Sequence, residues 1–565
     1  KDVGQIRQMI NLPNQIFKKM KHLFSIALLI TSFQGLAQLV NFELLESFSL
    51  SEVEQIVNDF GVPNNTITIT SGVDFYRVEY MTAHPNGEMV LVSGGIAVPN
   101  DVGSCASPIA SYQHGTTTVR TQVPSFLNGE GLLGVMYAGA GYVVTLPDFI
   151  GLGVSGLFHL YVHADSQASA SLDLIRLASN ELQEELGYTW DEQLFLFGYS
   201  QGGHATMALH KMIEEDFPEE FTVTASAPMS GPYDISGTQT NMIIADAPFS
   251  FSGFLPYVTM AYQAAYGNLY NSLDEIFIEP YATTLPDLFD GTNSIGYIST
   301  QLPAIPNQML RPEVFEAFQN DPNHPLRLAL ADNDVYDWAP TAPVTMYYCT
   351  EDEQVDYNNS LVALEAMTNN GATNVSALNG GALDHGACAP LAFLGCYFFF
   401  DEYRQDSFSL VYDVLVSDAS SGDVSDGALS FNLIEGDENY TLEWSNGENG
   451  QSIENLAPGE YTLTVTDASG CTSTESFAIS FPGVLSELDL TWKLYPNPSD
   501  GLVNIDWPFS SGSFDVFDLQ GKIVLSGPIQ VGLNQFSCTS LLTGMYHVRI
   551  STPDGFFNRR IAIEK

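Results

Sequence analysis

A Gly-x-Ser-x-Gly pattern at residues 198–202 places Ser200 where a nucleophile could act. The apolar run 194–197 before it favours a strand, and the run 205–212 after it favours a helix. A serine on a sharp turn between a strand and a helix has its hydroxyl exposed for attack, because the pattern's glycines leave room for a strained backbone. The alternative is a glycine-rich turn with an incidental serine. The flanking elements favour the nucleophile.

An acid that could support this serine is expected later in the chain. When the nucleophile lies on such a turn, the order is Ser, then Asp or Glu, then His, and the acid follows a later sheet strand. The apolar run 343–349 is typical of that strand, and it leads into an acidic turn. Within the turn, Asp352 is the first candidate for the acid because it best fits a small-x-x-Asp-x-x-Val pattern, and Asp356 is the second candidate.

The base follows by elimination, since only His385 and His547 come after Asp352. His547 belongs to a separate terminal region. His385 is expected in a loop just before the helix-like run 390–400. It would take the proton of Ser200, and Asp352 would hold the imidazole in the productive tautomer.

Backbone N–H groups could stabilise the oxyanion that forms when Ser200 attacks a carbonyl. The amide of Gln201 opens the helix after the nucleophile, and a second donor is expected from Gly115 or Thr116, after the strand expected at 108–112.

Two further polar residues, His114 and Asp148, are assigned supporting roles. His114 is interpreted as a hydrogen-bonded loop histidine, and Asp148 as a brace for loops around the site, since it precedes Ser200 in the chain.

The elements that would position these residues alternate between strands and helices. Strand-like runs at 73–81, 88–98, 108–112, 142–146, 194–197 and 343–349 and a helical stretch at 168–186 indicate a mostly parallel sheet in an α/β fold. About a hundred residues between Ser230 and Trp338 are rich in Phe, Tyr, Pro and Leu and exceed what the sheet needs. They predict a helical cap over the site, whose aromatic side chains would either suit an apolar acyl or aryl substrate or form the cap's own core.

The composition of the 565-residue chain limits its possible partners. The formal net charge is -49, so nucleic acid and anionic lipid would be repelled. The apolar fraction of 45% indicates packed globular material in several domains. The six cysteines are scattered without metal-ligand spacing, and Cys388 and Cys396 are close enough in sequence either to pair or to remain reduced.

The first 37 residues are typical of a targeting segment. Three lysines between Lys18 and Lys21 precede the apolar run 23–30, and 35–37 offers a small-x-small cleavage site, which predicts a secretory signal peptide starting at Met20. The apolar run is too short to span a bilayer. We predict four segments: 1–37 upstream sequence and signal peptide, 38–405 the catalytic domain with its cap at about 235–338, 406–482 a β domain, and 488–565 a second β domain.

Three motifs together resemble a known family. The runs Tyr-Gln-His-Gly-Thr at 112–116, Pro-Asp-Phe-Ile-Gly-Leu-Gly at 147–153 and Gly-Tyr-Ser-Gln-Gly-Gly-His at 198–204 are similar to those of secretory-lipase-like esterases with the α/β-hydrolase fold. Phe149 stands where that family usually has tyrosine. The resemblance covers roughly 70–402 and implies hydrolysis of small-molecule or lipid carboxylic esters without a metal or organic cofactor. One related group cleaves peptides, so a prolyl-oligopeptidase-like peptidase is an alternative.

From about Ser407 onward, the sequence changes to β-type runs separated by turn signals. Residues 410–480, with strand-like alternation around Trp444 and 456–467, resemble one immunoglobulin-like repeat of bacterial gliding-motility adhesins. The runs 494–501, 514–522 and 542–548 resemble the C-terminal sorting domain of the type IX secretion system, which implies a Bacteroidota-type organism, that secretion machinery as a partner, and a secreted or outer-membrane-surface location. A catalytically inactive surface adhesion or binding protein is therefore the other alternative to a serine esterase.

Overall fold

A computed structural model of the chain describes residues 38–62, 66–100, 105–405, 410–468, 470–481, 492–496, 499, 501–508, 511–517, 523–552 and 555–563. The predicted signal peptide, 1–37, lies outside these residues. The described residues divide into two compact units: those within 38–100 and 106–405 form the first, and Cys105 with those within 410–563 forms the second.

A nine-stranded sheet forms the centre of the first unit, in the order β1-β2-β3-β5-β4-β6-β7-β8-β9. The pairs from β1 to β5 are antiparallel, and the five pairs from β5 through β9 are parallel. The predicted α/β fold with a mostly parallel sheet is confirmed. The strands are β1 (Gln38–Phe48), β2 (Val73–Ala83), β3 (Met89–Pro99), β4 (Ser107–Gln113), β5 (Val143–Pro147), β6 (Trp190–Tyr199), β7 (Ala225–Met229), β8 (Val344–Tyr348) and β9 (Val375–Asn379).

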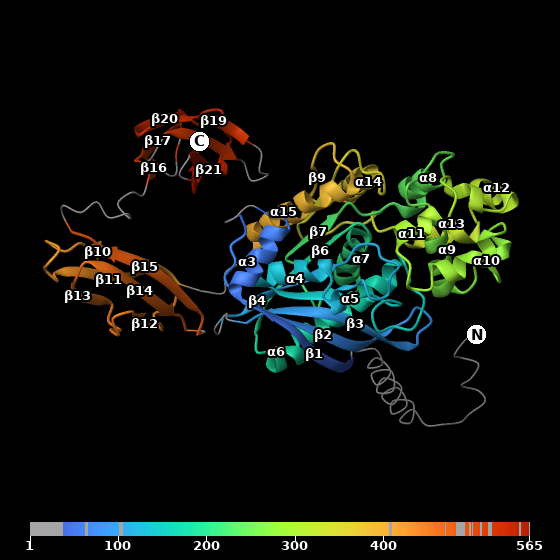
Figure 1. Cartoon of the computed structure of the whole chain (residues 1–565), viewed down its shortest axis with the longest axis horizontal. Helices are drawn as coiled ribbons and strands as arrows, with labels where there is room; N and C mark the ends of the chain where they lie inside the picture. Colours follow the sequence, from blue (N-terminus) through green and yellow to red (C-terminus); the bar gives the residue numbers. More distant parts are fainter. Residues whose placement is uncertain are drawn as a thin grey trace, which may run out of the picture. The chain divides into compact units, whose positions relative to one another are not determined.

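Helices pack on both faces of the sheet, and Figure 1 lets their order be followed. One hydrophobic core joins the sheet to α5 (Ala164–Ser179), α7 (Gln201–Asp216) and α14 (Asn358–Asn369). The other joins it to α3 (Leu50–Asp59), α4 (Gly129–Gly139) and α15 (His385–Tyr403). Every residue of β4, β5 and β7 is buried, as expected of strands covered on both sides.

One predicted helix is divided. The stretch 168–186 forms α5 and then α6 (Glu181–Leu186), which are separated by Asn180 at φ -131° and ψ -89°. These angles lie outside the helical region, and the Asn180 side-chain amide donates to the Arg176 carbonyl instead. After α6 the chain enters β6, the strand that leads to Ser200.

A helical cap lies between β7 and β8 in sequence and has its own hydrophobic core (Figure 1). Phe249, Phe254 and Tyr257 are buried in that core, so these aromatic side chains are structural parts of the cap. The cap elements are η2 (Ile235–Gln239), α8 (Thr240–Ile243), α9 (Phe254–Tyr266), η3 (Leu273–Glu275), α10 (Tyr281–Leu288), α11 (Ile295–Thr300), η4 (Pro306–Met309), α12 (Pro312–Asn320) and α13 (Pro325–Asp332).

Four of the six cysteines form disulfides. Cys349 pairs with Cys388, and Cys105 pairs with Cys471 within the second unit. Cys396 and Cys538 are free and buried. The sequence left open whether Cys388 and Cys396 pair; Cys388 is instead bonded to Cys349.

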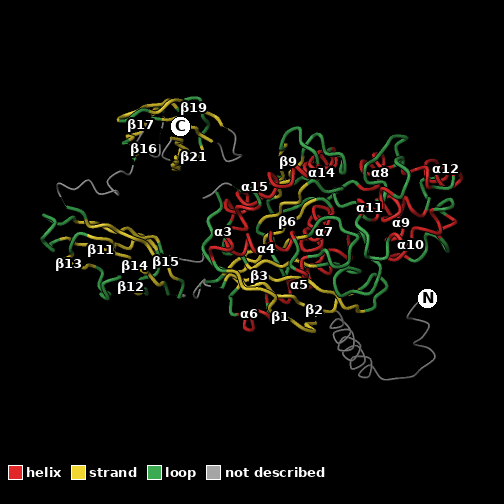
Figure 2. Tube along the Cα trace, in the orientation of Figure 1, coloured by secondary structure: helices red, strands yellow, loops and turns green. Residues whose placement is uncertain are grey.

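Among its described residues, the second unit contains strands and no helix, as the colouring in Figure 2 shows. Its first part has two three-stranded sheets, β10 (Val411–Ser417), β11 (Gly427–Glu435) and β13 (Ser452–Leu456) opposite β12 (Thr441–Trp444), β14 (Gly459–Thr466) and β15 (Thr472–Ile479). Both sheets contribute to one core around Trp444. The resemblance of this part to an adhesin repeat stays a prediction.

The second part contains sheets of three and four strands around a separate core that includes Trp492 and Trp507. The strands are β16 (Lys493–Tyr495), β17 (Leu502–Trp507) and β20 (Gly532–Ser537), then β19 (Ile523–Ile529), β18 (Gly512–Phe517), β21 (Gly544–Thr552) and β22 (Gly555–Ile563).

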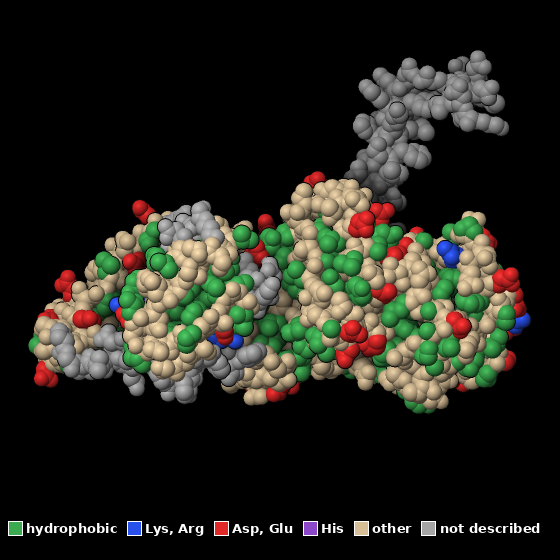
Figure 3. Space-filling view, turned by 90° about the horizontal axis from the view of Figure 1, so that it is seen from above, with side chains coloured by type: hydrophobic (Ala, Val, Ile, Leu, Met, Phe, Trp, Pro, Cys, Tyr) green, Lys and Arg blue, Asp and Glu red, His purple; other side chains and the backbone are tan. Residues whose placement is uncertain are grey.

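Acidic side chains are scattered over the face in Figure 3, where basic ones are few. Among the described residues, no helix is long and apolar enough to cross a membrane.

Candidate active site

Ser200 occupies a strained turn between β6 and α7. Its φ is 62° and its ψ is -120°, in a region that non-glycine residues rarely adopt. The amide of Ser200 donates to the Met229 carbonyl at 2.9 Å, and its side chain makes no capping bond to α7. A Cβ atom on Gly198 would lie 2.5 Å from the Gly202 carbonyl oxygen, and one on Gly202 would collide with the Gln113 carbonyl. The glycines therefore permit the tight approach of the turn to β4.

Asp352 and His385 are in direct contact. Nδ1 of His385 lies 2.7 Å from Oδ2 of Asp352, and both side chains are buried. The other carboxylate oxygen of Asp352 accepts the amides of Gln354 at 3.0 Å and Val355 at 2.9 Å. An ionised carboxylate only accepts hydrogen bonds, so Nδ1 carries the proton and Nε2 is left with a lone pair. That tautomer is the one a general base needs.

The structure places His385 in a helix, although the sequence suggested a loop. His385 is the first residue of α15, and Asp384 is its N-cap, with a side chain that accepts from Ala387 N at 2.8 Å. This cap starts the helix five residues before Pro390. The Tyr199 hydroxyl donates to the His385 carbonyl at 2.7 Å, so the residue before the nucleophile contacts the histidine.

Gln201 opens α7, and its side chain is held by a histidine that the sequence did not single out. Nδ1 of His159 donates to the Ile150 carbonyl at 2.9 Å, which leaves Nε2 as an acceptor. Nε2 accepts from the side-chain nitrogen of Gln201 at 2.8 Å. Burial is the main cause that lowers the pKa of His159 to about 3, so the ring is neutral. The Gln201 side-chain oxygen is buried and has no hydrogen-bond partner among the described residues.

Of the two candidate second oxyanion donors, one amide is occupied. The amide of Gly115 donates to a carboxylate oxygen of Glu130 at 2.8 Å, and that same oxygen accepts from the Tyr112 hydroxyl at 2.9 Å. The hydroxyl of Thr116 lies 3.3 Å from that of Tyr161. Glu130 comes from α4, and nothing in the sequence around it indicated this contact.

Asp148 and His114 hold the loops around the turn. One Asp148 oxygen accepts from the Ser93 hydroxyl at 2.5 Å, and the other accepts from the amide of Ser125 at 3.0 Å. His114 lies with Nδ1 2.7 Å from the Gly115 carbonyl oxygen and Nε2 3.1 Å from that of Asp148. Both residues are buried, and burial raises the pKa of Asp148. These contacts agree with the bracing role expected of Asp148 and with the hydrogen-bonded loop histidine expected at His114.

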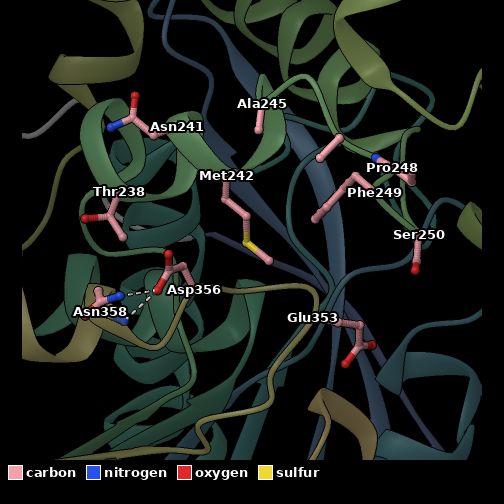
Figure 4. A pocket seen from close by; sticks show the side chains of 11 residues that line it. Thr238, Asn241, Met242, Ala245, Pro248, Phe249, Ser250, Glu353, Asp356 and Asn358 are labelled. Atoms are coloured by element: carbon pink, nitrogen blue, oxygen red, sulfur yellow. Dashed lines mark hydrogen bonds between the residues drawn. The ribbon is translucent and has the colours of Figure 1, made fainter.

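Asp356, the second candidate for the acid, binds elsewhere. Its carboxylate accepts from the backbone amide of Asn358 at 2.9 Å and from that residue's side chain at 2.7 Å, as the dashed lines in Figure 4 show. Both residues line an open depression of about 680 Å³, together with Glu353, Asn241 and Met242. Asp352, not Asp356, therefore contacts the histidine.

A second, mostly apolar cavity contains Ser200 and Gln201 in its wall. It is narrow, with an interior volume of about 50 Å³. Thr240 and Ile243 of α8 line it, whereas Asn241 and Met242 of the same helix line the open depression, so α8 separates the two spaces. The remaining wall is largely apolar cap side chains from α9, α12 and α13, chiefly Phe254, Leu255, Val258, Val314, Phe318, Leu326 and Leu330.

The candidate residues converge from four parts of the chain. Gln354 and Val355, which hold Asp352, line the same narrow cavity as Ser200. Among the described residues, hydrogen bonds join His385 to Asp352, but none joins Ser200 to His385. In the described ranges, no three His, Cys, Asp or Glu side chains gather as a group that could hold a metal ion.

Comparisons with known proteins agree with the fold. The secretory lipase family matches residues 116–392, and the secretion system C-terminal sorting domain matches 493–564. A candidate hydrolase of Legionella pneumophila is 30% identical with a TM-score of 0.59, covering 65% of this chain and 98% of its own. The G231F mutant of the rice cell wall degrading esterase LipA from Xanthomonas oryzae is 26% identical with a TM-score of 0.60, covering 65% and 99%.

Candida antarctica lipase A in its closed state, at 16% identity, TM-score 0.51 and coverage of 65% and 81%, shares the fold. Curated protein sequences gave no match. The fold, the site and these similarities define a hydrolase of the lipase and esterase class. The chain belongs to the secretory lipase family, and it carries a type IX sorting domain in its C-terminal region. It is a secreted or cell-surface protein.

Proposed function

We propose that this hydrolase cleaves carboxylic esters through an acyl-enzyme formed on Ser200. The observation that carries the proposal is the Asp352–His385 hydrogen bond of 2.7 Å at Nδ1, made by a histidine whose backbone is bonded to Tyr199, the residue before the strained serine turn. The secretory lipase family supports an ester as the substrate. The esterase neighbours from Xanthomonas oryzae support the same chemistry.

The reaction would proceed in two balanced halves. Oγ of Ser200 attacks the ester carbonyl while its proton moves to Nε2 of His385, and the tetrahedral intermediate collapses as that proton passes to the leaving alcohol. Water then attacks the acyl-enzyme, giving its proton to His385, which returns it to Ser200 as the carboxylic acid leaves. Asp352 holds the imidazole and stabilises its protonated form.

Two backbone N–H groups would stabilise the oxyanion. Gln201 offers its amide at the positive end of α7, directly after the nucleophile. Gly115 and Thr116 were the two candidates for the second donor. Since the Gly115 amide already binds Glu130, we assign the second donor to Thr116.

The acyl group would enter the narrow cavity under the cap. Its wall is mostly apolar and, among the described residues, contains no charged side chain, which suits a hydrocarbon chain and not a charged one. Because about 50 Å³ is little room, the resting cavity favours short acyl groups, and longer ones require cap side chains to rearrange.

A fluorophosphonate probe and p-nitrophenyl esters of several chain lengths test the proposal on purified protein. We expect covalent labelling and ester turnover in the wild type, and loss of both in Ser200→Ala and His385→Ala. Asp356→Asn is the matched control for a nearby carboxylate, and we expect it to keep both activities. Ester hydrolysis that survives in Ser200→Ala would exclude the acyl-enzyme, and folded wild type that never labels would favour a binding role.

A further inference from the structure

The Cys349–Cys388 disulfide flanks the contact between Asp352 and His385 on both sides. Cys349 precedes Asp352 by three residues, and Cys388 follows His385 by three. The disulfide and the 2.7 Å hydrogen bond therefore join the same two short segments, 349–352 and 385–388, at their opposite ends.

These two segments are anchored unequally. The segment with Asp352 continues from β8, which is paired with a strand on each side, and two backbone amides fix the carboxylate. The segment with His385 follows an exposed loop that contains Gly380 and Gly381, the latter at φ +106°. Consecutive glycines give a loop unusual backbone freedom. The histidine is thus on the less constrained side of the pair.

Hydrogen bonds restrain the backbone next to the histidine. The Tyr199 hydroxyl donates to the His385 carbonyl, and the His385 amide donates to the Glu353 carboxylate at 3.1 Å. The amide of Thr350 donates to the Gly381 carbonyl at 2.9 Å. None of these three contacts involves the next turn of α15. Among the hydrogen bonds and disulfides of the described residues, the Cys349–Cys388 disulfide alone joins that turn to the segment 349–352, through the buried Cys388.

Packing keeps the two sulfurs in place. A Cβ atom on Gly380 would lie 2.8 Å from Sγ of Cys349 and 3.8 Å from Sγ of Cys388, so the glycine loop lies directly on the disulfide. Both cysteines are buried. The disulfide thus supports the loop before His385 as well as the helix turn after it.

We propose that Cys349 and Cys388 are positioning residues for catalysis: their disulfide sets the start of α15 so that His385 stays within hydrogen-bonding distance of Asp352. This inference rests on the proposed function of that pair. Orientation errors of about 1 Å in a catalytic group can reduce a rate by about 10²-fold. Loss of the disulfide loosens only one of the restraints, so the expected loss is smaller.

The test compares turnover per active site in cysteine variants of the full chain. Fluorophosphonate titration counts the reactive sites in each sample, so misfolded material does not enter the rate. We expect kcat per titrated site to fall by about tenfold in Cys349→Ala, in Cys388→Ala and in the double variant alike, because each breaks the same bond. KM for a short p-nitrophenyl ester should stay within about twofold, since no cysteine lines the apolar cavity.

Three further variants separate positioning from stability. Cys349→Ala combined with Cys388→Val refills lost volume without the covalent bond and should show the same fall in kcat. Cys396→Ala removes a free buried thiol from the same helix, and Cys105→Ala with Cys471→Ala removes the other disulfide; both should keep the wild-type kcat.

A lower Tm with an unchanged kcat per titrated site would show that the disulfide only stabilises the fold, and would overturn the inference while leaving the proposed function intact. A rise in KM alone would overturn it as well. Wild-type protein that neither labels nor turns over an ester would overturn the proposed function itself, and the inference with it.

Discussion

His385 Nδ1 lies 2.7 Å from Asp352 Oδ2, and the second oxygen of that carboxylate is occupied by two loop amides. The carboxylate therefore has a fixed orientation before any substrate binds. Asp352→Asn retains the shape of the side chain but can present an amide N–H to the imidazole, which would favour the wrong tautomer. We expect kcat for ester hydrolysis to fall by about 10³–10⁴-fold.

The matched control for this substitution is Glu353→Gln, the neighbouring residue, whose carboxylate meets the His385 backbone and not its ring. Steady-state kinetics on both variants should show a loss of less than about tenfold in Glu353→Gln, in line with one weakened charged hydrogen bond. Equal losses in the two variants would mean that general disruption of the loop, and not the tautomer, limits the rate.

Gly202 permits the close approach of the serine turn to β4. A Cβ atom there would collide with the Gln113 carbonyl, which belongs to a buried strand and has little room to move. We expect Gly202→Ala to lower the free energy of unfolding by about 3 kcal/mol and to abolish fluorophosphonate labelling.

Gly129→Ala serves as its control, because Gly129 also lies in the first turn of a helix but a Cβ atom there meets nothing within 4 Å. That substitution should be neutral or stabilising by up to about 1 kcal/mol. Urea unfolding followed by the helical circular dichroism signal measures the stability of both variants, because the described helices belong to the first unit. Fluorophosphonate labelling in the absence of urea is compared separately. A tolerated Gly202→Ala would show that the turn is less tightly packed against β4 than its geometry implies.

Local signals in the sequence were sufficient to predict six of the nine strands of the central sheet and the strand–turn–helix around Ser200, whereas β1, β7 and β9 were not predicted. The flanking strand and helix of Ser200 are encoded within a dozen residues, and the position of Asp352 follows from the strand before it. The contacts of Glu130 and His159 were missed because each joins the site through tertiary packing, with no motif around it. The pairing of Cys388 with Cys349 was missed for the same reason, since sequence proximity suggested Cys396 as a partner of Cys388 and left open whether those two pair.

Acid should lower the stability of the first unit, which contains the candidate active site, partly through His159. Its pKa is lowered to about 3 in the folded chain, mainly by burial, whereas an unfolded histidine titrates near 6.5. Between these values the unfolded state binds more protons, so stability falls as pH falls from about 6.5 toward 3. We expect His159→Gln to make the stability less dependent on pH in that window and to leave the dependence above pH 7 unchanged.

Urea titrations from pH 7.5 to 4.5, followed by loss of ester hydrolysis, report this unit and not the β domains. His163 and His204 are also buried with their pKa values lowered to about 4, so the single substitution should reduce the slope and not remove it. A wild-type slope that is identical to that of His159→Gln would contradict the neutral, buried state of this ring.

Phe318 should limit the acyl chain that the enzyme accepts. It comes from α12, lines the narrow cavity that also contains Ser200, and is buried among cap side chains. Phe318→Ala enlarges the cavity without touching the residues proposed for catalysis, so we expect the ratio of kcat/KM for a twelve-carbon ester to that for a two-carbon ester to rise by about tenfold.

Phe289→Ala is the control, since it removes the same volume from the same cap core at a position outside the cavity wall. It should lower stability to a similar extent, as expected for deletion of a buried ring, and leave the chain-length ratio unchanged. Kinetics on a series of p-nitrophenyl esters distinguishes the cases. A ratio that stays constant in Phe318→Ala, or that rises equally in Phe289→Ala, would place the acyl chain elsewhere than in this cavity.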